Sequence, residues 1–159
     1  MSGLTIWALD WGPDGPRGFV RDLRLRWACE EAGLAYTVRT VPFEDRATNH
    51  LAQQPFGQVP FLQDGSLEIF ESGAGLLHLA RKSEVLMPRD PAGEAETLQW
   101  TIAALNSIEM ASVPWWFIGL SNPENNPLEG WRGQRLGDME RVLGEQPRLA
   151  AGRFTVVDL

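Results

Sequence analysis

The stretch PFGQVPFLQDGSLEIF, residues 55–70, decides the fold. Two short apolar runs, residues 59–62 and 67–70, flank the four residues QDGS. An Asp-Gly pair between two such runs is typical of a β-hairpin turn. The sequence therefore predicts two antiparallel strands here, followed by a helix from Ser72 to about Lys82.

Upstream of this hairpin, strand and helix patterns alternate. Residues 4–10 (LTIWALD) and 36–41 (YTVRTV) are predicted strands, and residues 11–18, with two Pro and three Gly, a loop. Apolar residues at every fourth position predict an amphipathic helix with Gly33 as its C-cap; they are Phe19, Leu23 and Trp27, with Val20 and Ala28 beside them. Residues 42–54 are a polar stretch that we expect to hold a short helix before Pro55. The expected order is thus β-α-β-(α)-β-β-α.

Downstream, the strand patterns stop. Residues 83–91 (SEVLMPRDP) read as a linker. One apolar face of a long helix is predicted from positions three or four apart: Ala95, Leu98, Ile102, Leu105, Ile108 and Ala111. Pro114 is expected to end or kink that helix, residues 122–127 (NPENNP) to form a loop, and residues 131–143 to form another helix.

Composition excludes several classes of function. With 14 Lys and Arg against 21 Asp and Glu, the net charge of this 159-residue chain is −7, and we expect no nucleic-acid partner. One cysteine, Cys29, excludes a disulfide framework and any CxxC redox or zinc site, and two histidines are too few for a His-based metal site. No apolar run approaches the ~20 residues of a membrane span. No signal peptide is recognised, so we expect no membrane partner and a cytoplasmic protein.

Four segments in this order resemble the glutathione S-transferase family, in its bacterial-type form: RLRWACEEAGLAY at 24–36, PFGQVPFL at 55–62, LEIFESGAGLLHL at 67–79 and GRFTVVD at 152–158. The resemblance implies an α/β thioredoxin-like domain at residues 1–82, a linker at 83–91 and a partial all-α domain at 92–159. It implies that the protein binds glutathione as co-substrate, adds its thiol to small-molecule electrophiles, needs no metal and forms a homodimer.

The resemblance also implies a glutathione site. The Val59–Pro60 bond is expected to be cis, which would let the Val59 backbone pair with the cysteinyl unit; an ordinary edge proline is the alternative. Ser72, at a helix N-terminus, would hold the γ-glutamyl carboxylate, or act simply as an N-cap, and Glu71 would pair with the ammonium. Gln58 would contact either the ligand or solvent.

The thiol-activating group is the point at which the sequence departs from the family. Members commonly place Ser, Cys or Tyr at the entrance to the first helix, whereas residues 18–21 here read GFVR. Arg17 and Arg21 are the candidates for catalytic charge, assisted by the N-terminus of that helix; both could equally be solvated surface residues. Cys29 is expected to be a small core residue.

The electrophile pocket is implied at Trp11, Asn106, Trp115 and Trp116, although plain core packing of the Trp residues is the alternative, and Asn106 could instead face a dimer interface. Thr155 and Asp158 form an S/T-x-x-acid helix start one residue before Leu159, which leads us to expect a C-terminal domain with helices missing.

Two functions remain open. The protein is either a glutathione transferase or a non-catalytic binding or scaffold protein of the same family. A thioredoxin-type disulfide reductase is excluded because it needs a CxxC pair.

Overall fold

The computed structural model describes residues 3–10, 12, 18–44, 48 and 50–159. Contacts within the chain divide it into two compact units, Met1–Leu86 and Met87–Asp158. The segment expected as a linker, residues 83–91, contains the division, and it includes two fully buried side chains, Leu86 and Met87.

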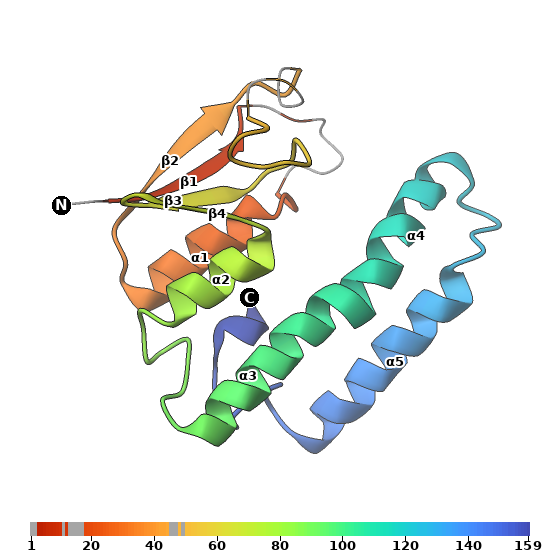
Figure 1. Ribbon diagram of the computed structural model, residues 1–159. Coiled ribbons are helices and arrows are strands. Elements are labelled where there is room, and N and C mark those ends of the chain that lie inside the picture. Colours follow the sequence, from red (N-terminus) through yellow and green to blue (C-terminus); the bar gives the residue numbers. More distant parts are fainter. Residues whose placement is uncertain (1–2, 11, 13–17, 45–47, 49) are drawn as a thin grey trace. The chain divides into compact units, whose positions relative to one another are not determined.

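The first unit is built on a four-stranded sheet of order β2-β1-β3-β4. Its strands are β1 (Leu4–Leu9), β2 (Tyr36–Val41), β3 (Phe61–Asp64) and β4 (Leu67–Phe70). β1 and β2 are parallel, whereas β3 is antiparallel to both of its neighbours. Helices α1 (Asp22–Ala32) and α2 (Ser72–Ala80) lie on one side of this sheet (Figure 1). The predicted order of the four strands and of helices α1 and α2 is therefore confirmed, and the sheet is thioredoxin-like.

The core of this unit lies between the sheet and the two helices. Ile6 and Leu62 face each other across β1 and β3, and both are fully buried, as is Leu25 of α1. The α1–α2 contact is close, because a Cβ placed at Gly75 would lie 2.9 Å from the Leu25 Cδ2 atom. A glycine at this position lets the two helices approach.

Most of the predicted apolar face of α1 is wrong. Phe19 precedes the helix and is 85% exposed, and Leu23 and Trp27 are about half exposed at 48% and 44%. Of the predicted face only Ala28 is buried, and the other buried side chains of the helix are Leu25, Cys29 and Asp22. Ala28 and Cys29 are small and so suit close packing, while the exposed Trp27 indole N–H donates to the Glu31 carboxylate at 2.9 Å. The predicted C-cap is confirmed, since Gly33 is left-handed with φ 63°.

The residues before β3 also differ from expectation. The strand begins at Phe61 rather than Val59, because Pro60 has no N–H to donate to a neighbouring strand. The polar stretch before Pro55 contains no helix among its described residues. It forms turns, in which the Gln53 and Gln54 N–H groups donate to the His50 carbonyl at 3.1 and 2.8 Å.

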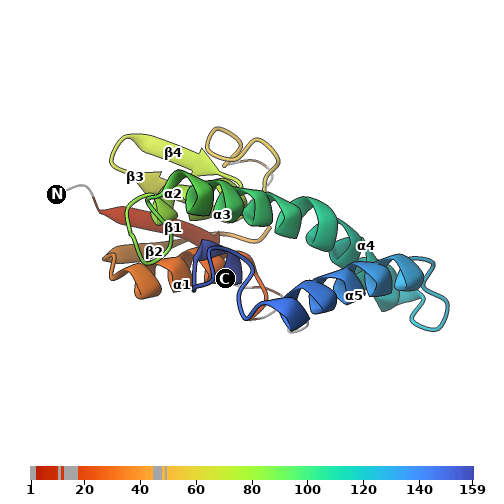
Figure 2. The ribbon, with the colours of Figure 1, turned by 90° about the horizontal axis from the view of Figure 1, so that it is seen from below.

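The second unit is helical. It contains α3 (Pro91–Ala103), the π-helix η1 (Ala104–Glu109), α4 (Met110–Ser121), α5 (Glu129–Glu145) and the short 3-10 helix η2 (Val156–Asp158). The first three form one continuous rod, and α5 returns alongside α4 (Figures 1 and 2). Pro114 does not end this rod, which continues to Ser121. A π-helical segment, η1, directly precedes α4. π-Helical turns and prolines are both common sites of irregular geometry within a helix.

The apolar face expected on the long helix is only partly confirmed. Ala111 is buried, but Ala95 and Ile102 are exposed, Ile102 at 48%. The remaining predicted residues are half-buried: Leu98, Leu105 and Ile108. Within α3 the buried residues are Gly93, Thr97 and Thr101. The two threonine hydroxyls donate to the carbonyls four residues earlier, at 2.7 and 2.8 Å. Since their polar atoms are thereby satisfied, these side chains can be buried in place of the larger apolar ones.

The turn of the β3–β4 hairpin is tied to the end of α2 by one carboxylate. Asp64 Oδ2 lies 2.8 Å from His78 Nε2 and 2.6 Å from Lys82 Nζ. Hydrogen bonds from Lys82 and then His78 lower the pKa of Asp64 below its ordinary value. A carboxyl with a lowered pKa stabilises the fold above its unfolded pKa of about 3.9, and that contribution is lost as the pH falls through the folded value.

We therefore expect Asp64→Asn to lose about 1–2 kcal/mol of unfolding free energy at pH 7. The difference from wild type should close as the pH falls below 4. Urea titrations of both chains at pH 7, 5, 4 and 3 measure it. A difference that stays constant over this range would contradict the assignment.

Candidate functional site

The predicted glutathione-binding residues meet at one end of the β3–β4 hairpin. Phe61 and Phe70 form the last residue pair of the β3–β4 ladder. Pro60 comes just before Phe61 and Glu71 just after Phe70, so both lie at the end of the hairpin opposite the Asp64-Gly65 turn. β1 reaches the same end, since Trp7 pairs with Phe61 near its carboxyl terminus. The register therefore brings the two predicted binding segments together at one end of the strands.

The Val59–Pro60 peptide bond is cis, as expected from the resemblance. Val59 is half-buried and Pro60 is buried, while the side chain of Gln58 is exposed. The loop before them is braced by Gln54, which is only 2% exposed. Its side-chain carbonyl accepts from the Phe56 N–H at 2.6 Å, and its backbone carbonyl accepts from the Gly57 N–H at 3.0 Å. The sequence reading did not single out Gln54, because a glutamine in a polar stretch gives no signal of burial.

This loop is also anchored to the sheet through His50. The His50 ring lies 6.2 Å from the rings of both Trp7 and Phe61, and those two stack at 5.3 Å. The aromatic cluster covers the face of the sheet opposite the helices, where Trp7 Nε1 donates to Gln63 Oε1 at 2.9 Å. His50 therefore has a packing role that the sequence did not indicate.

Glu71 and Ser72 form the start of α2. Glu71 has φ 70° and ψ 123°, a backbone conformation that is uncommon for a residue with a side chain. Its own carboxylate makes no capping hydrogen bond to the helix, and it is exposed. Ser72, by contrast, is 5% exposed. Strained backbone conformations of this kind concentrate at ligand sites. With this conformation the Glu71 carboxylate does not cap the first N–H groups of α2.

The start of α1 carries charges of both signs. Arg21 occupies the N-cap position, and its carbonyl accepts from the Arg24 N–H at 3.2 Å. Asp22, in the first turn, is buried and pairs with Arg26 at 2.5 Å. Burial raises the pKa of Asp22 above its ordinary value, against the opposing effect of Arg26. The other two predicted residues of this region, Arg17 and Trp11, lie outside the described residues.

Cys29 is a core residue, not a site residue. It is fully buried, and burial, with a smaller contribution from Glu30, raises the pKa of its thiol to about 11. A thiolate is needed for nucleophilic chemistry, so Cys29 is unsuited to catalysis.

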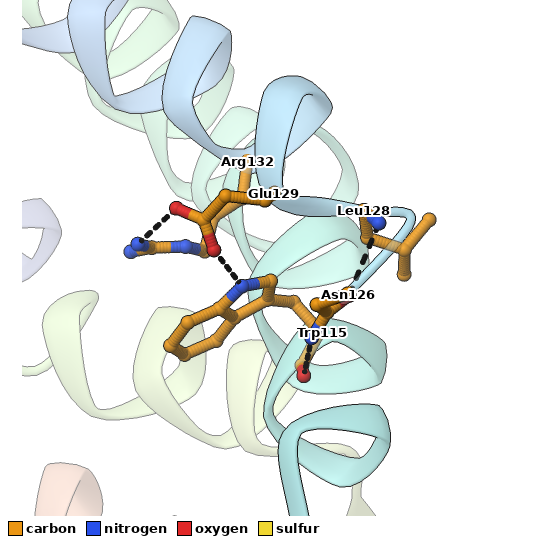
Figure 3. A network of polar contacts seen from close by, with 5 residues as sticks. All are labelled: Trp115, Asn126, Leu128, Glu129 and Arg132. Atoms are coloured by element: carbon orange, nitrogen blue, oxygen red, sulfur yellow. Dashed lines mark hydrogen bonds and ion pairs between the residues drawn. The ribbon is translucent and has the colours of Figure 1, made fainter. Parts of the chain in front are cut away.

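In the helical unit, Trp115 is the centre of a polar network (Figure 3). Its indole N–H donates to the Glu129 carboxylate, and Arg132 donates to the same carboxylate at 3.0 Å. The guanidinium carbon of Arg132 lies 3.9 Å from the Trp115 ring centroid. Asn126 Nδ2 donates to the Trp115 carbonyl at 2.7 Å and Asn126 Oδ1 accepts from the Leu128 N–H at 3.0 Å. Hydrogen bonds from Trp115 and then Arg132 lower the pKa of Glu129.

Beside this network lies a cavity of about 250 Å³, which we term the Trp115–Trp116 cavity. Its lining residues come from α4 and from the loop to α5: Trp115, Trp116, Gly119, Leu120, Pro123 and Asn126. Two of the predicted pocket residues are thus brought together. Asn106 is not in this lining; it is exposed in the π-helix.

Thr155 and Asp158 make the reciprocal contacts that their spacing indicates. The Asp158 carboxylate accepts from the Thr155 N–H at 2.9 Å, and the Thr155 hydroxyl oxygen accepts from the Val157 N–H at 3.4 Å. The short helix η2 follows from this cap.

The described residues contain no group of three or more His, Cys, Asp or Glu side chains placed to hold a metal ion. Within the same part of the chain, none of the helices has the length and apolar character needed to cross a membrane.

A thioredoxin-like sheet followed by a helical unit, with a cis-proline and a helix N-terminus at one sheet edge, defines the class of the protein. Residues 15–81 match the family model described as "Glutathione S-transferase, N-terminal domain". Over these residues the chain belongs to the glutathione S-transferase family.

Individual relatives agree with this assignment. Glutathione S-transferase 1 of Schizosaccharomyces pombe is 29% identical over 174 aligned positions, which span 100% of this chain and 73% of that protein. Glutathione S-transferase 1 of Zea mays is 41% identical over 98 residues, which span 54% of this chain and 45% of that one. Among solved structures, the theta class enzyme of Xanthomonas axonopodis pv. citri with glutathione bound is 29% identical, with a TM-score of 0.79 over 99% of this chain and 78% of that one.

Proposed function

We propose that the protein is a transferase that binds glutathione and conjugates its thiol to small electrophiles. The observation that carries this proposal is the meeting of Val59–Pro60 and Glu71–Ser72 at one end of the β3–β4 hairpin. The relative from Xanthomonas axonopodis matches 99% of the present chain, and its crystal structure contains bound glutathione.

Each of these residues suits one part of the tripeptide. The half-buried Val59 can pair its N–H and C=O with the cysteinyl unit, as an added strand would. Ser72 can donate its hydroxyl and its N–H to the γ-glutamyl carboxylate, which the positive end of the α2 dipole also attracts. Glu71, exposed and free of a capping role, can pair with the adjacent ammonium. Gln58 is exposed at the rim of the same site.

In this proposal, groups at the start of α1 activate the glutathione thiol. Each pKa unit by which the glutathione thiol is lowered requires about 1.4 kcal/mol of preferential thiolate stabilisation. Arg21, at the N-cap of α1, and Arg17 supply positive charge, and the first backbone N–H groups of α1 supply donors. Asp22 opposes them when it is ionised, but the burial that raises its pKa also disfavours its charged form.

One observation favours a second candidate, a non-catalytic glutathione-binding or scaffold protein. Residues 18–21 contain no Ser, Cys or Tyr, and Cys29 is buried with a pKa of about 11. Turnover of 1-chloro-2,4-dinitrobenzene with glutathione distinguishes the two. A rate well above background that falls in Arg21→Ala would exclude the scaffold role, whereas no turnover by a chain that binds glutathione would establish it.

The remaining assignments follow the family. We propose a cytoplasmic homodimer with a role in detoxification, and we place the electrophile beside Trp115 and Trp116. Asn106, which does not line the Trp115–Trp116 cavity, and Trp11, which lies outside the described residues, stay predictions of the resemblance.

The test of glutathione binding is calorimetric titration of the whole chain. We expect Ser72→Ala to lose at least about 1.5 kcal/mol of glutathione binding free energy, which is the scale of a hydrogen bond to a charged group. The matched control is Ser66→Ala, an exposed serine in the turn at the opposite end of the same hairpin. It should bind as wild type does.

Two outcomes would contradict this proposal. The first is the absence of saturable binding by the folded wild-type chain. The second is equal affinity of the wild-type and Ser72→Ala chains, which would place the carboxylate elsewhere.

A further inference from the structure

We propose that His50 is a positioning residue for the glutathione site: its ring packs on the sheet and thereby holds in place residues 50–61, the 50–61 loop, which carries Gln58 and Val59. The assignment of those two residues to glutathione rests on the function proposed above. The packing of His50 and its effect on the loop rest only on contacts within the first unit.

The two ends of the 50–61 loop meet through aromatic rings. His50 begins the loop and Phe61, the first residue of β3, ends it, and their ring centroids lie 6.2 Å apart at an interplanar angle of 40°. The His50 ring lies at the same distance from Trp7, at an angle of 52°. A segment whose ends are not joined must be ordered, at an entropic cost, when it binds a ligand. The ring contacts impose that order before glutathione arrives.

Trp7 is a fixed support for the His50 ring. It stacks on Phe61 at 5.3 Å, and its Nε1 donates to Gln63 Oε1 at 2.9 Å. The guanidinium carbon of Arg39 lies 5.9 Å from its ring centroid. Since these partners come from β2 and β3, Trp7 is held from both of the strands that flank β1. Aromatic rings with centroids about 4.5–7 Å apart attract each other beyond the effect of burying their area, so His50 gains from resting on this support.

A series of hydrogen bonds connects His50 to the residues that would bind glutathione. The His50 carbonyl accepts from the Gln54 N–H at 2.8 Å. The Gln54 side-chain carbonyl then accepts from the Phe56 N–H at 2.6 Å, and its backbone carbonyl accepts from the Gly57 N–H at 3.0 Å. Gly57 directly precedes the segment proposed to contact the ligand. Release of the His50 ring would therefore loosen every turn up to that segment.

The ring of His50, and not its Nδ1 atom, makes these contacts. Within the described part of the chain, His50 Nδ1 is buried and has no hydrogen-bond partner. A buried polar atom without a partner lowers stability, so a ring that lacks this nitrogen should serve at least as well. The positioning role therefore requires an aromatic ring, which phenylalanine supplies and asparagine does not.

The experiment measures glutathione affinity by calorimetry for the whole wild-type chain and for two variants, His50→Phe and His50→Asn. We expect His50→Phe to bind within about twofold of wild type, because it keeps the ring contacts. His50→Asn should raise the Kd by roughly tenfold or more, because the loop must then be ordered on binding. Wild-type affinity in His50→Asn, or a loss in His50→Phe as large as that in His50→Asn, would overturn the proposal.

The matched control is the same substitution at the other of the chain's two histidines. His78 lies in the last turn of α2 and contacts Asp64, at the opposite end of the β3–β4 hairpin. His78→Asn should therefore lower the unfolding free energy and keep the wild-type Kd for glutathione. A loss of affinity in His78→Asn equal to that in His50→Asn would show that affinity follows general stability, and the positioning role would fail.

Native-state hydrogen exchange tests the loop without any ligand. In wild type the amides of Gln54, Phe56 and Gly57 should be protected, because each donates a hydrogen bond within the loop. His50→Asn should speed their exchange by roughly tenfold or more and leave the β1 amides unchanged, since only a local opening is made easier. Unprotected loop amides in wild type, or equal exchange in the two chains, would contradict the role of His50.

The two measurements separate this proposal from the function on which it partly rests. If wild type binds no glutathione, the proposed function fails together with the glutathione role of His50, and hydrogen exchange still decides whether His50 holds the loop. If glutathione binds and His50→Asn speeds exchange without changing the Kd, the positioning role fails and the proposed function stands. In turnover with 1-chloro-2,4-dinitrobenzene, a positioning role raises the KM for glutathione at an unchanged kcat, whereas partial unfolding lowers kcat at an unchanged KM.

Discussion

Leu62→Ala should lower the unfolding free energy by about 2–5 kcal/mol, the range found for large-to-small substitutions in packed cores. Leu62 is fully buried in β3, where it faces Ile6 of β1 on one side and Ile69 of β4 on the other. Truncation removes contacts on both sides of the strand at once. Neither neighbour can refill the space without disturbing the ladder that sets the register of Pro60 and Glu71.

The matched control is Leu67→Ala, the same chemical change on the adjacent strand. Leu67 is 55% exposed, so its truncation should cost less than about 0.5 kcal/mol. Urea titration followed by far-ultraviolet circular dichroism measures both variants against wild type. Equal losses in the two variants would show that β3 does not carry the core of the first unit.

The largest part of the fold could be predicted because a few short-range signals specify it. The Asp-Gly turn, the short apolar run of β1 and the Gly33 cap each act within a few residues, and each is present in the structure. The resemblance of residues 55–79 added the cis bond at Val59–Pro60, which no local pattern in the sequence requires.

Burial was predicted less well because it depends on neighbours distant in the sequence. A four-residue repeat marked Phe19, Leu23 and Trp27, but which side of α1 is buried is decided by the sheet and by the close approach of α2 at Gly75. In α3, threonines replaced the expected apolar residues, because a hydroxyl bonded to its own helix can be buried.

The candidate site shows the same division. Val59, Pro60, Glu71 and Ser72 could be named from their pattern, and the register brings them to one edge. The strained backbone of Glu71 and the bracing role of Gln54 could not be predicted, since they arise from how the loop and helix meet the sheet. The network of Trp115 with Glu129 and Arg132 joins two helices, and no spacing rule along one helix reveals it.

Cys29 should be almost unreactive toward a thiol reagent in the folded chain. Its side chain is fully buried, and its pKa is raised from 9.0 to about 11. At pH 8 the shift alone lowers the thiolate fraction by about a hundredfold, and exclusion of the reagent lowers the rate further. We therefore expect labelling by 5,5′-dithiobis(2-nitrobenzoate) to be more than a hundredfold slower in buffer than in 6 M guanidinium chloride.

The labelling rate also reports on the first unit alone, because Cys29 is the chain's one cysteine and lies in α1. Leu62→Ala should therefore speed native labelling, while Leu67→Ala should not, since labelling requires an opening that the buried leucine resists. Glutathione should slow labelling in wild type if it binds at the edge where α2 begins, and Ser72→Ala should remove that protection. Rapid labelling of the folded wild-type chain would contradict both the burial of Cys29 and its unsuitability for catalysis.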